Sequence, residues 1–125
     1  MINIRRYGIS ILYCFLILIA CTLNLSSMPS APVSNFDKFV HFFMFFLLGT
    51  CVYFENSNYF KTPVSFLRII NGTLLFPIVY GGLIELIQDH ISPFRTGDWA
   101  DFVWNSFGAV FGVLIALLIN RTRNR

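Results

Sequence analysis

Four long apolar stretches, joined by short polar connections, constrain this chain more than any other feature of its sequence. They cover residues about 7–25, 36–54, 64–88 and 98–120. A helix needs roughly 20 mostly apolar residues to cross the hydrocarbon core of a bilayer, so each stretch is long enough. The sequence therefore predicts an all-α fold, an integral membrane bundle of four transmembrane helices, with residues 1–125 forming a single domain.

The composition excludes the main alternative classes. The chain is 56% hydrophobic and only 12% charged, whereas an ordinary soluble domain is about 25% charged. A soluble domain of this size needs a largely polar surface, and a disordered chain is poor in apolar residues. The net charge of +3 is interpreted through its distribution, because basic residues orient membrane helices. We expect no nucleic-acid partner.

The basic residues predict the orientation of the helices. With the N-terminus in the cytoplasm, the outer side carries only Lys38 and Arg95. The inner side then carries the other seven of the nine Lys and Arg residues: Arg5, Arg6, Lys61, Arg68, Arg121, Arg123 and Arg125. Cytoplasmic loops of membrane proteins carry such an excess. We therefore expect a multi-pass protein of the plasma membrane with both termini in the cytoplasm.

The first stretch has an alternative interpretation as a signal peptide. Arg5 and Arg6 form a basic start, and the segment 18–21 (LIAC) resembles a lipoprotein cleavage box that would be lipidated at Cys21. A retained helix is favoured, because the rest of the chain is itself embedded in the membrane. Cys14, Cys21 and Cys51 all fall in apolar stretches, and we interpret them as small buried residues.

Nearly all the polar chemistry falls at the outer ends of the predicted helices. Residues three or four apart share a helix face, which pairs Asp37 with His41 and Glu85 with Gln88. An ionised carboxylate facing lipid would cost several kcal/mol, so these groups should face the interior of the bundle. One stripe of the fourth helix carries Asp98, Asp101, Asn105, Gly108 and Gly112.

These residue types suit several chemistries. Arg95 and Lys38 suit an anionic headgroup, because guanidinium grips phosphate or carboxylate with two donors. His41 beside Asp37 could act as a general base. A divalent metal could be held by a histidine with the carboxylates of the cluster, although no ligand spacing is diagnostic. The candidate metal-binding acids are Glu85, Asp98 and Asp101.

A purely structural interpretation also accounts for part of the pattern. Asp37 and Asp98 are placed to cap helices, and Arg95 could pair with a carboxylate. Capping does not explain Glu85, Gln88 and Asn105, which lie inside or beside apolar runs. Gly108 and Gly112 allow another helix to approach closely, either within the bundle or by self-association.

The spacing of the polar residues resembles the VanZ-like family of small bacterial membrane proteins. The resemblance covers residues 36–118 and rests on three blocks: Asp37-Lys38-x-x-His41, Glu85-x-x-Gln88, and Arg95-x-x-Asp98-x-x-Asp101-x-x-x-Asn105 followed by Gly108 and Gly112. It implies a multi-span bacterial membrane protein, in a family named for an accessory protein of glycopeptide resistance associated with teicoplanin. The candidate catalytic residues are His41, Glu85 and Asp101, and the candidate binding residues are Asp37, Lys38, Gln88, Arg95, Asp98 and Asn105.

The leading functional hypothesis is an outward-facing polar site that binds, and modifies, an anionic lipid headgroup or lipid-linked cell-wall precursor. Whether the protein is an enzyme stays open at this point. Two rival hypotheses are a small transporter or proton pathway, motivated by Glu85 and Asn105 inside apolar runs, and a structural membrane protein that binds a partner. Against transport, no polar residues continue into the inner half of the predicted helices.

Overall fold

Each of the four apolar stretches forms a helix in the computed structural model, which describes residues 4–22, 36–59, 66–90 and 99–123. The first is α1 (Gly8–Thr22), preceded by a short 3-10 helix, η1 (Ile4–Tyr7); the second is α2 (Phe36–Tyr59); the fourth is α5 (Trp99–Arg123). The third consists of three consecutive segments: α3 (Phe66–Ile69), the π-helical η2 (Ile70–Leu74) and α4 (Leu75–His90).

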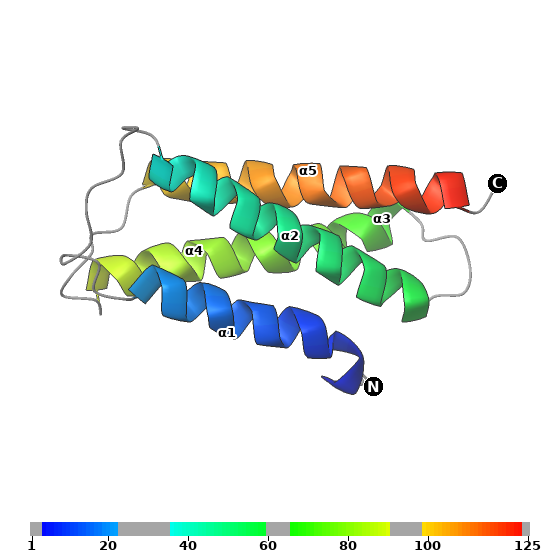
Figure 1. The fold of residues 1–125 in the computed structure, drawn as a ribbon, viewed down its shortest axis with the longest axis horizontal. Helices are drawn as coiled ribbons and strands as arrows, with labels where there is room; N and C mark the ends of the chain where they lie inside the picture. Colours follow the sequence, from blue (N-terminus) through cyan, green and yellow to red (C-terminus); the bar gives the residue numbers. More distant parts are fainter. Residues whose placement is uncertain (1–3, 23–35, 60–65, 91–98, 124–125) are drawn as a thin grey trace.

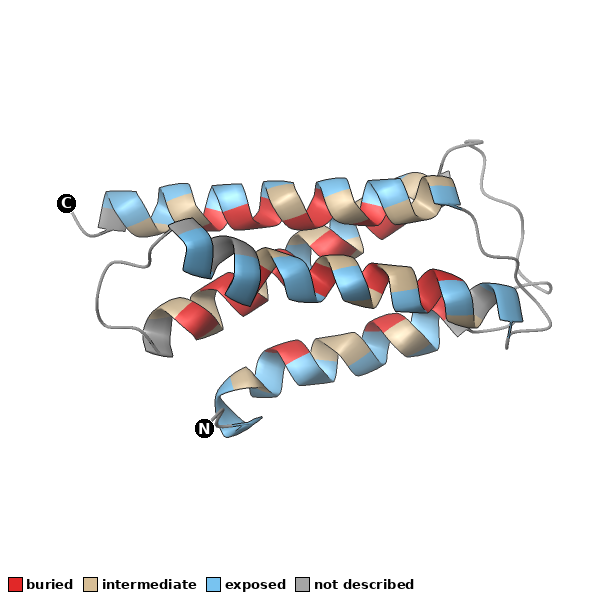
Figure 2. Ribbon diagram, turned by 180° about the vertical axis from the view of Figure 1, so that it is seen from behind, coloured by how far each residue is buried: buried red, intermediate tan, exposed pale blue. Residues whose placement is uncertain are grey.

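The exposed surface of the bundle is apolar, as a protein surrounded by lipid requires. Large side chains such as Phe15, Phe43 and Phe111 are each about half exposed or more, and the buried residues line the inward faces of the helices (Figure 2). A surface of this kind would aggregate in water. Among the described residues, three helical segments are long and apolar enough to cross a membrane: Ile4–Cys21, Lys38–Ser57 and Trp99–Thr122.

The predicted all-helical membrane bundle is therefore confirmed. The apolar helix in the third stretch, Asn71–Ile87, is shorter than the other three. That it crosses the whole membrane therefore stays a prediction. The start of α1 and the end of α5 lie at the same end of the bundle (Figure 1). The side of the membrane on which this end lies also stays a prediction.

The closest packing in the bundle is between α2 and α5. A Cβ atom added at Gly108 would lie 2.2 Å from the carbonyl oxygen of Phe42, and one at Gly112 would lie 2.1 Å from that of Phe46. Only glycine lets the two backbones approach so closely. Thr50 of α2 adds a hydrogen bond from its hydroxyl to the carbonyl of Gly112, at 3.2 Å. The close approach expected of these glycines is thus made to α2 of the same chain.

A layer of apolar side chains fills the middle of the bundle. Phe45 and Leu48 of α2, Ile84 of α4 and Ala109 of α5 are all completely buried. Cys21 of α1 is also buried and belongs to the same cluster as Phe45 and Ile84. Helices α1, α2, α4 and α5 all contribute to this core, with α1 packed against α2 and α4. The core therefore separates the polar groups at the two ends of the bundle.

The third helix is irregular where proline interrupts its hydrogen bonding. The π-helical segment η2 ends three residues before Pro77. A π-type hydrogen bond from residue 77 would reach the carbonyl of Gly72, but proline has no N–H. Asn56 of α2 supplies a donor instead, with Nδ2 2.7 Å from the Gly72 oxygen and 3.0 Å from Oγ1 of Thr73. The hydroxyl of Tyr7 in turn donates to Oδ1 of Asn56.

Helix α2 continues past the predicted end at residue 54, where the sequence indicated a polar connection. It extends to Tyr59 because the polar residues of its last turns bond to other helices. The carboxylate of Glu55 accepts the backbone N–H groups of Ile9 and Ser10, at 3.0 and 3.4 Å. The first N–H groups of a helix have no partner within it, and the helix dipole favours a negative charge there. Glu55 therefore caps α1 from a neighbouring helix.

Replacing Glu55 by alanine should loosen the start of α1. We expect hydrogen exchange at the amides of Ile9 and Ser10 to accelerate roughly fivefold, corresponding to about 1 kcal/mol for a lost cap. Exchange measured by mass spectrometry or NMR on protein in nanodiscs would report this change. Ser57→Ala is the matched control, because among the described residues the Ser57 hydroxyl bonds to the carbonyl of Phe54 within α2. Unchanged exchange in Glu55→Ala would contradict the capping role.

Candidate functional site

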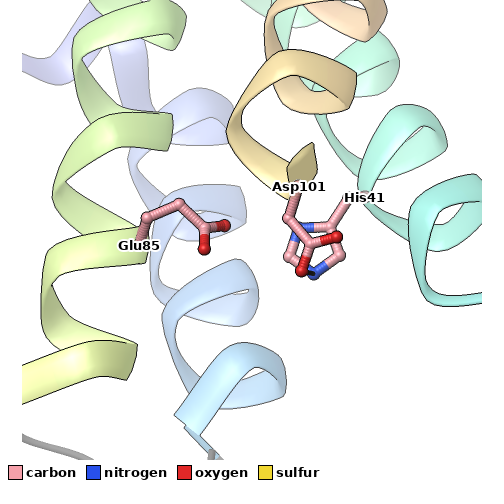
Figure 3. Close-up of side chains that lie close together, drawn as sticks. All are labelled: His41, Glu85 and Asp101. Atoms are coloured by element: carbon pink, nitrogen blue, oxygen red, sulfur yellow. Dashed lines mark ion pairs between the residues drawn. The ribbon is translucent and has the colours of Figure 1, made fainter. Parts of the chain in front are cut away.

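Three ionisable side chains from three different helices meet near one end of the bundle. They are His41 of α2, Glu85 of α4 and Asp101 of α5. One nitrogen or oxygen atom from each lies within 4.8 Å of the others. Figure 3 shows the Glu85 carboxylate pointing toward His41 and Asp101. The three residues were predicted as the chemically active members of the cluster, and the fold brings all three together.

A hydrogen bond to Asn105 orients the ring of the histidine. His41 Nδ1 lies 2.9 Å from Oδ1 of Asn105. An amide oxygen only accepts hydrogen bonds, so Nδ1 carries the proton. In neutral His41 the lone pair is then on Nε2, the nitrogen that lies 3.8 Å from Oδ2 of Asp101. This separation exceeds a hydrogen bond. His41 thus presents an available nitrogen to the carboxylates.

The site is largely shielded from its surroundings. His41 and Glu85 are only 2% and 3% exposed, and Asn105 is completely buried. The Asp101 side chain is 15% exposed and forms the open edge of the cluster. Burial in a medium of low dielectric strengthens the interaction of these groups with a bound cation or proton. The cluster is therefore a built site with one accessible side.

The helices place the site near the boundary of the apolar region. Asp101 is in the first turn of α5, and His41 is three residues after the start of the apolar segment Lys38–Ser57. Glu85 lies in the second half of α4, which ends at His90. The start of α2, the end of α4 and the start of α5 lie at the end of the bundle opposite the start of α1 (Figure 1). A ligand at the membrane surface could therefore approach Asp101.

A glycine makes room for the amide that orients His41. A Cβ atom at Gly81 would lie 3.2 Å from Cβ of Asn105 and 3.4 Å from its Nδ2. Gly81 is one turn before Glu85 on α4, and Asn105 is one turn after Asp101 on α5. This spacing places Gly81 and Glu85 on the inward face of α4. It likewise places Asp101 and Asn105 on the inward face of α5. The Nδ2 atom of Asn105 has no hydrogen-bond partner among the described residues.

The other predicted site residues are only partly covered by the structure. Lys38 is half-buried, one turn before His41 on α2. Asp37 and Gln88 lie on α2 and α4, but their side chains are outside the described part of the chain, as are Arg95 and Asp98 altogether. Their roles stay predictions.

A second polar cluster, at the opposite end of the bundle, was not anticipated. Tyr7, Asn56 and Thr73 form it through the hydrogen bonds around the irregular third helix, and Glu55 lies beside Asn56 on α2. The sequence gives little signal for it, because its members are far apart in the chain and follow no helical spacing. Its observed contacts join helices, so we interpret it as structural.

Together the fold and the site define a helical membrane protein with a buried His–Glu–Asp cluster at one end of its bundle. The family is identified by sequence comparison: the VanZ/LLP1 family model matches residues 7–120, and the chain belongs to this family. The predicted resemblance to VanZ-like proteins is confirmed.

One relative extends the family beyond bacteria. The chain is 34% identical over 114 residues to the uncharacterized protein C11E3.10 of the fission yeast Schizosaccharomyces pombe. The alignment covers 90% of this chain and 66% of the yeast protein, so the chain spans slightly less than two thirds of that relative. No solved structure matches the chain. Because this relative is fungal, family membership alone does not make the protein bacterial.

Proposed function

We propose that this VanZ/LLP1 protein binds and modifies an anionic lipid headgroup, or a lipid-linked cell-envelope precursor, at the His41–Glu85–Asp101 cluster. The observation that carries the proposal is the convergence of these three side chains within 4.8 Å at one end of a membrane bundle. Intramembrane ionisable residues mark functional sites by default, because placing them there is costly. The cluster lies on the outer face of the plasma membrane in the orientation given by the basic residues, with both termini cytoplasmic.

The residues divide into two roles in this proposal. The carboxylates of Glu85 and Asp101 are the candidate proton acceptors. His41, held at Nδ1 by Asn105, keeps Nε2 directed at the cluster. Lys38, one turn away, and Arg95 supply positive charge for the anion. For a phosphate ester, hydrolysis would add water to phosphorus and break the ester bond. The water proton would pass to one of the two carboxylates and from there to the departing lipid alcohol. Asp101, at the open edge of the cluster, faces the approaching headgroup.

Two observations favour headgroup chemistry. The first disfavours a transporter or proton pathway, and the second concerns the kind of ligand. The completely buried apolar layer of Phe45, Leu48, Ile84 and Ala109 lies between the two polar ends, which is unfavourable for a continuous proton or ion path. The 34% identical fungal relative favours a ligand that bacterial and fungal membranes share. Phosphate-bearing lipids meet this requirement. Teicoplanin resistance would then be one specialised consequence of envelope lipid chemistry.

The proposal is tested with purified protein in phosphatidylcholine nanodiscs that contain either phosphatidic acid or a polyprenyl diphosphate. We expect lipid retention above that of empty nanodiscs and release of inorganic phosphate. Glu85→Gln and Asp101→Asn should reduce the release about 100-fold, the typical effect of removing an acid–base group. Asp89→Asn is the matched control, because Asp89 is an exposed acid at the end of the same helix as Glu85.

The same variants can be compared in a bacterial host sensitive to teicoplanin, at equal membrane abundance. Protection by the original chain that disappears in Glu85→Gln and Asp101→Asn would connect the cluster to the cell envelope. Neither retention nor phosphate release by the original chain, or equal activity in all three variants, would overturn the proposed function.

A further inference from the structure

We infer that His41, Glu85 and Asp101 bind one divalent transition-metal ion, of the Mn²⁺ or Zn²⁺ type. The inference deepens the proposed function and rests on it, because the headgroup is the molecule that the metal would bind. The cation would allow a site rich in carboxylates to hold an anionic headgroup. The structure places one ring nitrogen of His41 beside one carboxylate oxygen each from Glu85 and Asp101, and we assign Nε2 as the nitrogen donor.

The separations between the donor atoms suit a shared ion. Metal–ligand bonds of about 2.0–2.2 Å place two donors on one ion roughly 3–4 Å apart. His41 Nε2 and Asp101 Oδ2 are 3.8 Å apart, which is too long for a hydrogen bond. One ring nitrogen of His41 and one carboxylate oxygen from each acid lie within 4.8 Å of one another. Small side-chain adjustments would bring them onto a common ion.

Asn105 provides an observation that is independent of the acidic residues. Histidines that bind metals generally donate their second ring N–H to a fixed acceptor, which orients the ring and selects the tautomer. His41 makes this contact from Nδ1 to Oδ1 of Asn105, at 2.9 Å and completely buried. The arrangement leaves the Nε2 lone pair on the side of the carboxylates. A histidine meant only as an ion-pair partner of Asp101 would be expected closer to it than 3.8 Å.

Charge and donor type favour a transition metal. A divalent ion balances two carboxylates, and neutral His41 adds a donor without adding charge. Magnesium and calcium prefer an all-oxygen environment, whereas an imidazole nitrogen combined with carboxylates suits zinc, iron or manganese. Three protein ligands leave coordination positions open, as in catalytic metal sites. Phosphate oxygens could occupy those positions from the exposed side at Asp101.

The test uses the full chain in phosphatidylcholine nanodiscs, stripped of metal and titrated with Mn²⁺ or Zn²⁺ alone. We expect one ion per chain, and pulsed EPR of the Mn²⁺ form should show coupling to one imidazole nitrogen. His41→Gln and Glu85→Gln should each weaken binding at least about tenfold. His90→Gln is the control, because His90 is 69% exposed in its side chain and lies next to a carboxylate, that of Asp89. It should bind as tightly as the original chain.

Three results would overturn the inference: no saturable binding of either ion, Mn²⁺ bound without nitrogen coupling, or equal weakening in His90→Gln. The spectrum of the original chain decides the question even where His41→Gln fails to fold. Because phosphatidylcholine is zwitterionic and no anionic lipid is present, metal uptake is measured apart from binding of an anionic headgroup. Metal uptake without such headgroup binding would remove only the proposed function. Headgroup binding without metal uptake would remove only the metal.

Discussion

Replacing Gly112 by alanine should destabilise the protein by about 3 kcal/mol, near the upper end of the usual range for overpacking. The added Cβ would lie 2.1 Å from the carbonyl oxygen of Phe46, 3.0 Å from its carbonyl carbon and 3.1 Å from its Cα. All three atoms belong to the backbone of α2, so no side-chain rotation relieves the clash. Helices α2 and α5 must separate, which also breaks the hydrogen bond from Thr50 to Gly112.

The prediction is checked by unfolding the protein in mixed micelles with increasing denaturing detergent. Gly8→Ala is the matched control, because a Cβ there would have no atom within 4 Å beyond its own helix and chain neighbours. We expect Gly8→Ala to unfold at the same detergent fraction as the original chain. Equal stability of Gly112→Ala and Gly8→Ala would show that α2 and α5 do not pack as described.

The second large effect is expected at Asn105. Replacement by leucine, which is similar in size, removes the acceptor of the His41 Nδ1 proton and leaves a buried donor unsatisfied. We expect a loss of about 1–3 kcal/mol of stability and metal binding weakened about 10- to 100-fold, the usual effect of removing a residue that orients a ligand. Calorimetry and Mn²⁺ titration measure the two effects separately.

Two further variants distinguish orientation of His41 from simple packing. Asn105→Asp keeps an oxygen for the Nδ1 proton and should retain metal binding close to that of the original chain. Ser106→Ala is the control, one residue further along α5. Among the described residues its hydroxyl bonds to the carbonyl of Phe102 in the same helix. Its loss should change neither stability nor metal binding. If Asn105→Asp binds metal as weakly as Asn105→Leu, Asn105 does not act through the histidine.

Most of the fold could be predicted from the apolar runs alone. The lengths of these runs and the short connections between them predicted four helices. A segment inside lipid must satisfy its backbone hydrogen bonds internally, and a helix does so within itself. The ends were less accurate, since α2 continues beyond residue 54 to Tyr59. That extension depends on Glu55 and Asn56 bonding to residues 46 and 49 positions away. Contacts across such distances leave no periodic signal.

Helical spacing predicted groupings along each helix but not the contacts between helices. It grouped Asp101 with Asn105 on one face of α5, and both lie close to His41 in the structure. The same reasoning paired His41 with Asp37, whose side chain is outside the described part of the chain, so that pairing stays a prediction. The contacts between helices depend on the rotation of α2 relative to α5, which the glycines of α5 set. Sequence spacing describes one helix at a time and does not specify that rotation.

The close pairing of α2 with α5 also determines the order in which the protein can be assembled. Hydrogen bonds between the two helices join residues 62 to 67 positions apart, with α3, η2 and α4 between them in the chain. During synthesis α2 enters the bilayer before α5 has been made, because α5 is the last helix of the chain. Until then His41 has neither Asn105 nor Asp101. The His41–Glu85–Asp101 cluster is therefore completed only when the last helix is in place.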